Sequence, residues 1–370
     1  MDDILPLSGL KVVDATSNIA GPYGGSILGD LGAEVLKIET PTGDPSRSMA
    51  PVEGDRSAYF HIVNRNKTVE TIDLKSEDGR ARLDEHLADA DVFMTNFLPD
   101  RLAKLGLDSD SMRERWPRLI IGNLSSYGVE GFSSTWPGYD ATVQARTGIM
   151  HITGERDGAP VRTGVSVLDI GSGMWLAMGI LAAIIKREKT GVGSLVETSL
   201  YETGVVWVSY HLAAYSLTGN PSVRSGSGHP TFSPYGIFHA QDADICIGVG
   251  NDAIFAKLAM LLGRQDLVTD PRFVLNVDRV ANALALTHLI NDALQAKSAF
   301  DWTVLLTKNG VPADVVVPPE KLFQDPQAEA NKILMAYPDD TSAVNQIPGL
   351  PIRFDHQRLP IRKAAPHRKD

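Results

Sequence analysis

The sequence predicts an α/β protein with an open parallel sheet and a second, smaller α+β domain. Short apolar runs alternate with helix-like segments over the first third of the chain, which is typical of β-α-β units. A segment rich in Gly, Ser and Pro interrupts this pattern after Leu217. The 370 residues also exceed what one simple core usually organises, so we expect two domains.

The first β-α-β unit begins near the N-terminus. A buried strand is expected over residues 10–15, a short helix over the sequence YGGSILGDLG, and a second strand over residues 34–39. A helix is expected from Ser76 to residue 90. Its start is indicated by Ser76 and by the acidic residues of the first turn. Further strands are predicted at residues 68–74, 91–97 and 118–126.

One carboxylate, Asp169, lies between a strand-like run over residues 165–168 and a long apolar helix expected over residues 174–187. A Gly-Ser-Gly turn is predicted between them. Aspartate is among the best helix caps, so capping is one interpretation of Asp169. A partly desolvated carboxylate is also a good nucleophile, and the residues alone leave both interpretations open.

The second half of the chain divides at the Gly/Ser/Pro segment. Residues 237–310 indicate a compact α+β unit with a strand in DICIGVG and helices over residues 252–262 and 279–296. We therefore expect a large domain over residues 1–217, completed by about 325–370. A linker is expected over residues 218–236 and a small domain over residues 237–324.

Composition excludes several classes of protein. The net charge of −10 argues against a nucleic-acid surface, which needs clustered basic residues. The single cysteine, Cys246, forms no intrachain disulfide and is expected to be buried in a strand. The apolar run over residues 174–185 is about half of a bilayer span, and the N-terminus does not resemble a signal peptide. A cytoplasmic protein without membrane contact is expected.

Basic residues recur near the ends of predicted strands. In an open α/β sheet the ligand crevice lies at the carboxyl ends of the strands, so these residues are candidate anion contacts. The loop from Ser17 to Gly25 is a second candidate, with a plain tight turn as the alternative. The sequence has no dinucleotide or Walker glycine motif, no G-x-S-x-G and no metal-binding histidine pair. The basic residues are Lys37, Arg65, Lys67, Arg101 and Lys104.

A series of motifs resembles the class III CoA-transferases, the group of formyl-CoA:oxalate and carnitine CoA-transferases. The series includes PLSGLKVVDAT, AGPYGGSILGDLGAEVLKIE, NRNKTVETIDLK, ADVFMTNFLPDRLAKLGL, PGYDATVQARTGIM and LDIGSGMWLAMGILAAIIKREKTGVGSLVETSL, in this order over nearly the whole chain. The resemblance implies a Rossmann-like CoA-binding domain and a smaller domain joined into a ring-shaped chain. It also implies that two rings interlock as a homodimer.

The resemblance further identifies Asp169 as the nucleophile of a CoA transfer from an acyl-CoA donor to a carboxylic acid acceptor, without a metal. An aspartate with an ordinary pKa of about 4 is ionised at neutral pH and needs no general base. Small residues beside Asp169 would let the thioester approach. The glycines Gly226 and Gly228 resemble a loop that covers the site. The implied CoA contacts are Ile19, Ala20, Asn64, Arg65, Asn66, Asn96, Phe97, Lys104 and Tyr139.

Three positions and the C-terminal segment bear on this assignment. Lys104 replaces a more usual Arg, and Thr40 stands where some members place an Arg against the adenine. Tyr139 stands near the position where the family's 2-methylacyl-CoA racemases carry a His base, which favours transfer over racemisation. Members usually continue with a GEHT-like segment and a final helix, where this sequence reads RKAAPHRKD. A racemase and a non-catalytic CoA-binding protein are the alternatives.

Overall fold

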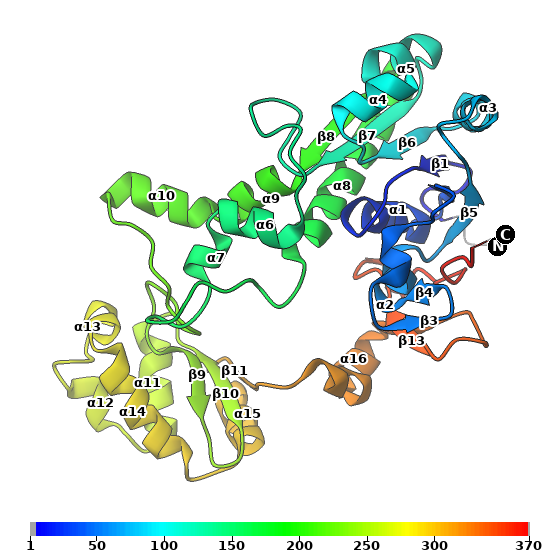
Figure 1. Ribbon diagram of the computed structural model, residues 1–370. Coiled ribbons are helices and arrows are strands. Elements are labelled where there is room, and N and C mark those ends of the chain that lie inside the picture. Colours follow the sequence, from blue (N-terminus) through cyan, green and yellow to red (C-terminus); the bar gives the residue numbers. More distant parts are fainter. Residues whose placement is uncertain (1–4, 369–370) are drawn as a thin grey trace. The chain divides into compact units, whose positions relative to one another are not determined.

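The computed structural model describes residues 5–368 and divides the chain into two compact units (Figure 1). The first unit comprises Met1–Ile149, Arg162–Ser216 and Phe323–Asp370, and the second comprises Met150–Val161 and Leu217–Leu322. The chain therefore leaves the first unit and returns to it twice. The segment predicted as a linker, residues 218–236, belongs to the second unit.

Six parallel strands form the central sheet of the first unit in the order β5-β2-β1-β6-β7-β8 (Figure 1). The direction of this order reverses between β1 and β6, as in Rossmann folds, whose ligands bind at the carboxyl ends of the strands at such a reversal. The predicted parallel α/β sheet is confirmed. The strands are β1 (Lys11–Asp14), β2 (Glu34–Glu39), β5 (Lys67–Thr71), β6 (Val92–Thr95), β7 (Ile120–Ser125) and β8 (Leu195–Ser199).

Helices cover both faces of this sheet. Ile121 faces the core under α3, α4 and α5, whereas its neighbour Gly122 faces Ile180 of α8, because side chains alternate along a strand. Helix α1 packs against α8 on that second face. The Ser76 hydroxyl caps α3 by accepting from the Gly79 N–H at 3.0 Å, as predicted. The bounds are α1 (Ala20–Asp30), α3 (Glu77–Ala88), α4 (Pro99–Leu105), α5 (Ser109–Arg115) and α8 (Val167–Thr190).

Helix α8 begins earlier than the sequence predicts. The expected strand-like run and Gly-Ser-Gly turn are both wrong, because α8 already includes Val167, Asp169 and the glycines that follow. Gly173 meets the backbone of α1, where a Cβ atom on it would lie 2.5 Å from the Ala20 carbonyl oxygen. Tertiary packing thus outweighs the low helix propensity of glycine.

Helix α8 is also longer than the apolar run over residues 174–185, which was judged to be about half of a bilayer span. On length and composition alone α8 is able to cross a membrane, with a mean hydropathy of 1.8 over 18 residues. Core helices pass the same test, and 44% of that window is buried inside the molecule.

Shorter elements complete the first unit. They are η1 (Pro45–Ser48), β3 (Val52–Glu53), β4 (Arg56–Ser57), α2 (Ala58–Val63), α6 (Asp140–Arg146), α7 (Ile149–Ile152, at the boundary), α9 (Leu200–Trp207), α10 (Ser209–Thr218, also at the boundary), α16 (Pro326–Asn331), β12 (Leu334–Ala336), β13 (Gln346–Pro348), β14 (Arg353–Phe354) and β15 (Gln357–Arg358).

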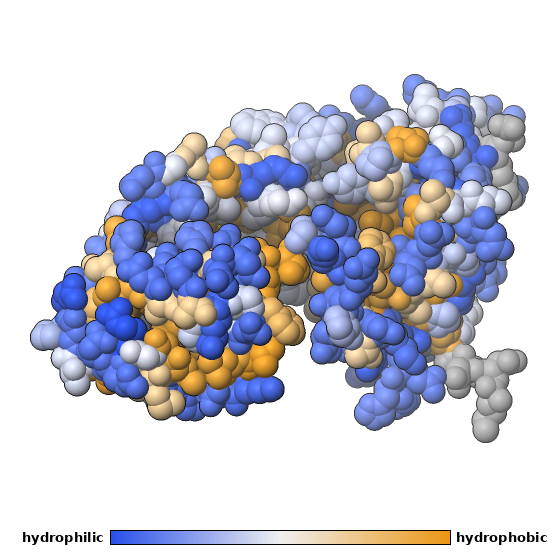
Figure 2. Space-filling view, turned by 90° about the horizontal axis from the view of Figure 1, so that it is seen from below, coloured by the Kyte–Doolittle hydropathy of each residue, from blue (hydrophilic) through white to orange (hydrophobic). Residues whose placement is uncertain are grey.

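The second unit is built on an antiparallel sheet with the order β11-β10-β9. Ile245 and Ile247 of β10 are fully buried, so the alternating Cys246 is exposed, and the prediction of a buried cysteine is wrong. Apolar patches lie between polar side chains on the face shown in Figure 2. The elements are β9 (Tyr235–His239), β10 (Asp244–Gly248), α11 (Asp252–Leu261), α12 (Asp266–Thr269), α13 (Asn276–Ala281), α14 (Ala283–Leu294), α15 (Ala299–Lys308), β11 (Ala313–Val315) and η2 (Pro319–Gln324, reaching the boundary).

Two expectations for the second unit change. The strand β9 begins inside the segment that was predicted to be a linker. The single helix expected over residues 279–296 is two helices, α13 and α14, which meet at Asn282. The Asn282 side chain donates to the Asp278 carbonyl at 2.9 Å, which satisfies a backbone group at this break.

The α1–α8 contact predicts the effect of a single methyl group. Gly173→Ala should lower the free energy of unfolding by about 1–3 kcal/mol, because the new Cβ meets backbone that is unable to rotate away. Gly164→Ala is the matched control, since its Cβ would meet nothing within 4 Å. Urea unfolding of both variants measures the difference, and equal stabilities would contradict a close contact between these helices.

Candidate active site

Asp169 lies in a cavity of about 110 Å³ at the carboxyl ends of the central strands. The loops after β1, β6 and β7 form its walls, and the start of α6 closes one side. This is the edge at which Rossmann-type sheets bind ligands. The lining residues are Ser17, Asn18, Ile19, Ala20, Met49, Asn96, Phe97, Leu98, Pro99, Asn123, Leu124, Ser125, Ser126, Val129, Gly138, Tyr139, Asp169 and Leu200.

The structure brings six of the predicted site residues together around this cavity: Asp169, Ile19, Ala20, Asn96, Phe97 and Tyr139. Tyr139 precedes α6 and is 69% exposed, so its ring is accessible to a ligand. Asn96 uses its side-chain amide inside the protein. Its Oδ1 accepts from the Ser17 N–H at 3.1 Å, and its Nδ2 donates to the Ser17 carbonyl at 2.9 Å.

The segment Asn64–Asn66 faces the interior instead. Arg65 forms a buried ion pair with Asp30 at 2.6 Å, and the Asn66 amide donates to the same carboxylate at 2.8 Å. The Asn64 Oδ1 accepts from Lys67 at 3.0 Å. The structure therefore places these three residues beneath helix α1 and away from the Asp169 cavity.

Three other predicted residues also lie apart from this cavity. Lys104 is exposed on α4 and does not line it. Gly226 and Gly228 belong to the second unit, where both line a cavity of about 480 Å³. Gly226 adopts a φ of +60° and donates to the Gly154 carbonyl at 3.1 Å. Their approach to Asp169 stays a prediction.

A second carboxylate, Asp140, binds the backbone N–H of Asp169 and was not predicted from the sequence as a site residue. Asp140 is buried, and its Oδ2 accepts from the Leu168 N–H at 2.8 Å and from the Asp169 N–H at 3.2 Å. Asp140 thus satisfies the free N–H groups at the start of α8, so the capping role considered for Asp169 falls to Asp140. Its place directly after Tyr139, at a helix start, was the available signal.

Burial and the Asp140 carboxylate, in that order, raise the pKa of Asp169 to about 7. Both effects disfavour a second negative charge at this point. The expectation that Asp169 has an ordinary pKa is therefore wrong. At a pH near 7 Asp169 is therefore partly protonated, and its ionised form is more basic than that of an ordinary aspartate.

The loop that follows β1 is fixed by hydrogen bonds to the backbone of Thr16, Ser17 and Asn18. The Thr16 N–H donates to Asp14 at 3.0 Å, and the Thr16 carbonyl accepts from Lys37 at 3.0 Å. The Asn18 N–H donates to Asp44 at 3.1 Å, and Asn18 has a φ of +68°. Asn96 binds both backbone groups of Ser17 in the same loop, so the loop is fixed before any ligand binds.

The charged groups beneath this loop pair with one another. Lys37 lies 2.6 Å from Asp44, Lys67 lies 2.8 Å from Asp14, and all four side chains are at most 1% exposed. Burial lowers the pKa of Lys67 to about 8, although Asp14 opposes this effect. These lysines support the loop and are not available to a ligand in the crevice.

One polar group of the cavity wall has no partner among the described residues. The Asn123 side chain on β7 is 8% exposed, and its Oδ1 has no hydrogen bond within the protein. A buried amide of this kind is satisfied by a bound polar group. Asn123 is a further cavity residue that was not predicted from the sequence.

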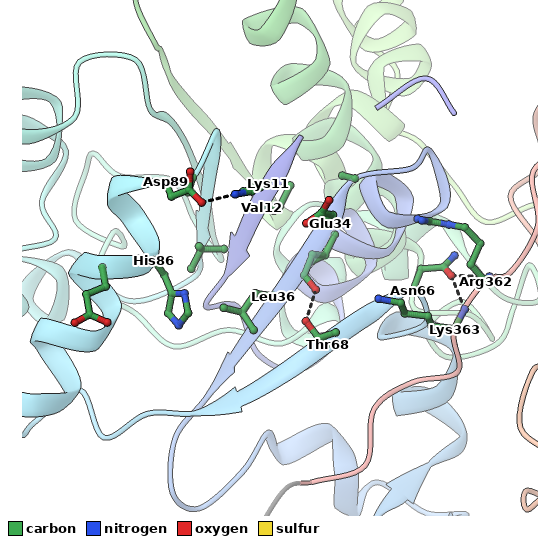
Figure 3. Close-up of a pocket in the computed structure, with 15 residues that line it drawn as sticks. Lys11, Val12, Glu34, Leu36, Asn66, Thr68, His86, Asp89, Arg362 and Lys363 are labelled. Atoms are coloured by element: carbon green, nitrogen blue, oxygen red, sulfur yellow. Dashed lines mark hydrogen bonds and ion pairs between the residues drawn. The ribbon is translucent and has the colours of Figure 1, made fainter. Parts of the chain in front are cut away.

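A larger cavity of about 470 Å³ lies at the opposite edge of the sheet, near the first residues of β1 and β2 (Figure 3). The polar groups that line it form ion pairs and hydrogen bonds with one another. Lys11 pairs with Asp89, and the Asn66 Oδ1 accepts from the backbone N–H groups of Arg362 and Lys363 at 2.7 and 2.9 Å. We assign no chemistry to this cavity.

Comparison with known proteins agrees with this geometry. An acetyl-CoA:oxalate CoA-transferase of Acetobacter aceti is 37% identical over 94% of this chain and 89% of its own length. A human succinyl-CoA:glutarate CoA-transferase is 33% identical over 97% of this chain and 82% of its own length. A CAIB/BAIF family protein from Brucella suis superposes with a TM-score of 0.88 at 35% identity, covering 99% of this chain and 97% of that chain.

The family described as CoA-transferase family III matches residues 7–369, which is nearly the whole chain. Its matched region includes every residue of the Asp169 cavity and extends over both compact units except for the chain ends. The chain belongs to the class III CoA-transferases and is an enzyme that transfers CoA between an acyl-CoA and an acid.

Proposed function

We propose that Asp169 is the nucleophile of this transfer and that it carries the acyl group and then CoA. The observation that supports this proposal is the raised pKa of Asp169 in a cavity formed by the predicted CoA loop residues Ile19, Ala20 and Phe97. A carboxylate in such a crevice attacks a thioester directly, and each step below conserves an activated acyl bond.

In the proposed mechanism an Asp169 oxygen attacks the thioester carbon of the donor, and the C–S bond breaks to release the CoA thiolate. The thiolate then attacks the Asp169 carbonyl of the resulting anhydride and releases the donor acid. The acceptor carboxylate attacks the aspartyl-CoA thioester, which forms a second anhydride and frees the thiolate again. The thiolate takes the acceptor acyl group and restores Asp169.

The acceptor is proposed to be a short carboxylic acid. Relatives are named for oxalate and glutarate, two dicarboxylic acids, and for acetyl-CoA and succinyl-CoA as donors. The Asn123 Oδ1 in the cavity wall has no partner among the described residues and, as an acceptor, supports a contact to an N–H or O–H group of a bound substrate. Tyr139, a poor base at neutral pH, favours transfer over exchange of an α-proton.

A second copy of this chain is the proposed macromolecular partner. Met174, Met178 and Ile185 share one face of α8 and are 47%, 54% and 61% exposed. Val206 and Trp207 of α9 add exposed apolar surface, and Trp175 contacts Trp207 with ring centroids 6.0 Å apart. Apolar surface of this extent is typical of a protein interface, which supports the homodimer that the family resemblance implies.

Mass spectrometry tests the nucleophile. After incubation with acetyl-CoA, the wild-type protein should carry an acyl or CoA adduct on Asp169, and Asp169→Asn should carry none and lose at least about a thousandfold in rate. Asp110→Asn, on the exposed surface of α5, is the matched control. An α-proton exchange in deuterated water without an adduct would identify a racemase instead, and CoA binding without either would leave a binding protein.

The pH dependence of kcat/KM tests the raised pKa of Asp169. Because the ionised carboxylate attacks, kcat/KM should rise about tenfold per pH unit below pH 7 and level off above it. Asp140→Asn keeps an acceptor for the start of α8 but removes a nearby charge, so it should lower the pH of the midpoint. A rate that is constant down to pH 5 would contradict the raised pKa.

Sedimentation tests the proposed dimer. The wild-type protein should have twice the 40.0 kDa mass of one chain at micromolar concentration. Met178→Glu should shift the equilibrium toward the single chain, because it places a charge on the apolar face of α8. Lys186→Glu, on the same helix, is the matched control, and a single-chain mass for the wild-type protein would exclude the dimer.

A further inference from the structure

A second cavity of about 160 Å³ adjoins the Asp169 cavity in the first unit. Ser17 and Phe97 line both cavities, so the two form neighbouring parts of one crevice at the carboxyl ends of the strands. The second cavity is formed by the ends of β1 and β2 and by the segments that follow β5 and β6. A long ligand with its thioester at Asp169 has a path along this crevice.

Arg101 is the only positively charged side chain among the described residues that line this second cavity. Its guanidinium carbon lies 3.9 Å from the centroid of the Phe97 ring, a contact that orients the planar group. Arg101 is exposed, and no carboxylate of the described residues pairs with it. Its five N–H donors are therefore free for a ligand.

The acidic residues of this cavity are already neutralised. Glu39 accepts from Arg47 at 2.9 Å, and Asp44 pairs with Lys37 at 2.6 Å. Both carboxylates are 1% exposed, and their oxygens point to these partners. The charge of Arg101 is thus uncompensated in the crevice, which suits an anionic ligand.

The other basic residues predicted at these strand ends do not serve this cavity. Lys37, Arg65 and Lys67 form buried ion pairs, as described above. Lys104 is exposed but does not line the cavity. Thr40, where some relatives place an arginine, lines the cavity with a neutral hydroxyl that contacts Thr42 at 2.9 Å.

We propose that Arg101, rather than Lys104, pairs with a phosphate group at the nucleotide end of CoA. This assignment rests on the proposed function, because it takes CoA as the ligand of the Asp169 crevice. The guanidinium fork, which lies over the Phe97 ring, donates two parallel hydrogen bonds to phosphate oxygens. Arg101 contacts no reacting atom and therefore acts in binding.

Calorimetric titration of CoA, dephospho-CoA and pantetheine into the wild-type protein and variants tests the assignment. Arg101→Ala should weaken CoA binding roughly tenfold to a hundredfold and leave pantetheine binding unchanged. Arg101→Lys should give an intermediate loss, because it keeps the charge but not the fork. If the loss disappears with dephospho-CoA, the partner is the 3′-phosphate; if it persists, the partner is the pyrophosphate.

Arg113→Ala, an exposed arginine on α5, is the matched control. CoA affinity that is unchanged in Arg101→Ala, or that falls only in Lys104→Ala, would overturn the assignment. An equal loss for pantetheine would also overturn it, because pantetheine has no phosphate. A wild-type protein that binds CoA but transfers nothing would refute the proposed function alone, since the titration requires no turnover.

Discussion

The backbones of α1 and α8 meet at Gly24 and Gly173, where neither helix carries a side chain, and the position of Asp169 depends on this contact. A Cβ atom on Gly24 would lie 2.9 Å from the Gly173 carbonyl oxygen. Because α1 follows the loop with Ile19 and α8 carries Asp169 in its first turn, the close crossing places both at one cavity. Larger residues at the crossing would separate Asp169 from the loop.

The buried charges of the first unit serve the same loop. Carboxylates and ammonium groups out of contact with water are costly unless they are paired, and here each pair also binds backbone. Lys37 reaches the Thr16 carbonyl, and Lys67 reaches the Pro22 carbonyl at 2.7 Å. The crevice is therefore preorganised by interior charge, and the exposed Arg101 remains for the ligand.

The central sheet was predictable because most of its strands contain short apolar runs with Gly, Pro or polar residues at their ends, although β5 and β8 are mostly polar. The candidate site was predictable only through motifs: Asp169 on its own suggested a cap, and its neighbours suggested a turn. The local sequence does not show which helices will pack against each other. That contact makes Gly171 and Gly173 helical, and it gives Asp140, 29 residues away, the capping position.

The spacing of strand-end basic residues was equally ambiguous without the fold. Lys37 lies within β2, Lys67 begins β5 and Arg101 follows β6 on α4, and of these three only Arg101 lines the crevice. Burial separates them, and burial follows from the layers on both faces of the sheet. Cys246 shows the same limit, since the alternation of one strand exposes it although its neighbours are fully buried.

The Asp140–Asp169 pair has a consequence for which half of a mixed anhydride reacts. In the proposed mechanism the thiolate chooses between two carbonyls, and attack on each expels the other carboxylate. The weaker base leaves faster, and an ordinary substrate acid with a pKa of about 4 is a weaker base than Asp169 at about 7. In that mechanism attack at the Asp169 carbonyl is favoured, so burial of Asp169, together with the charge of Asp140, biases the reaction toward the aspartyl-CoA thioester and away from unproductive return to the donor.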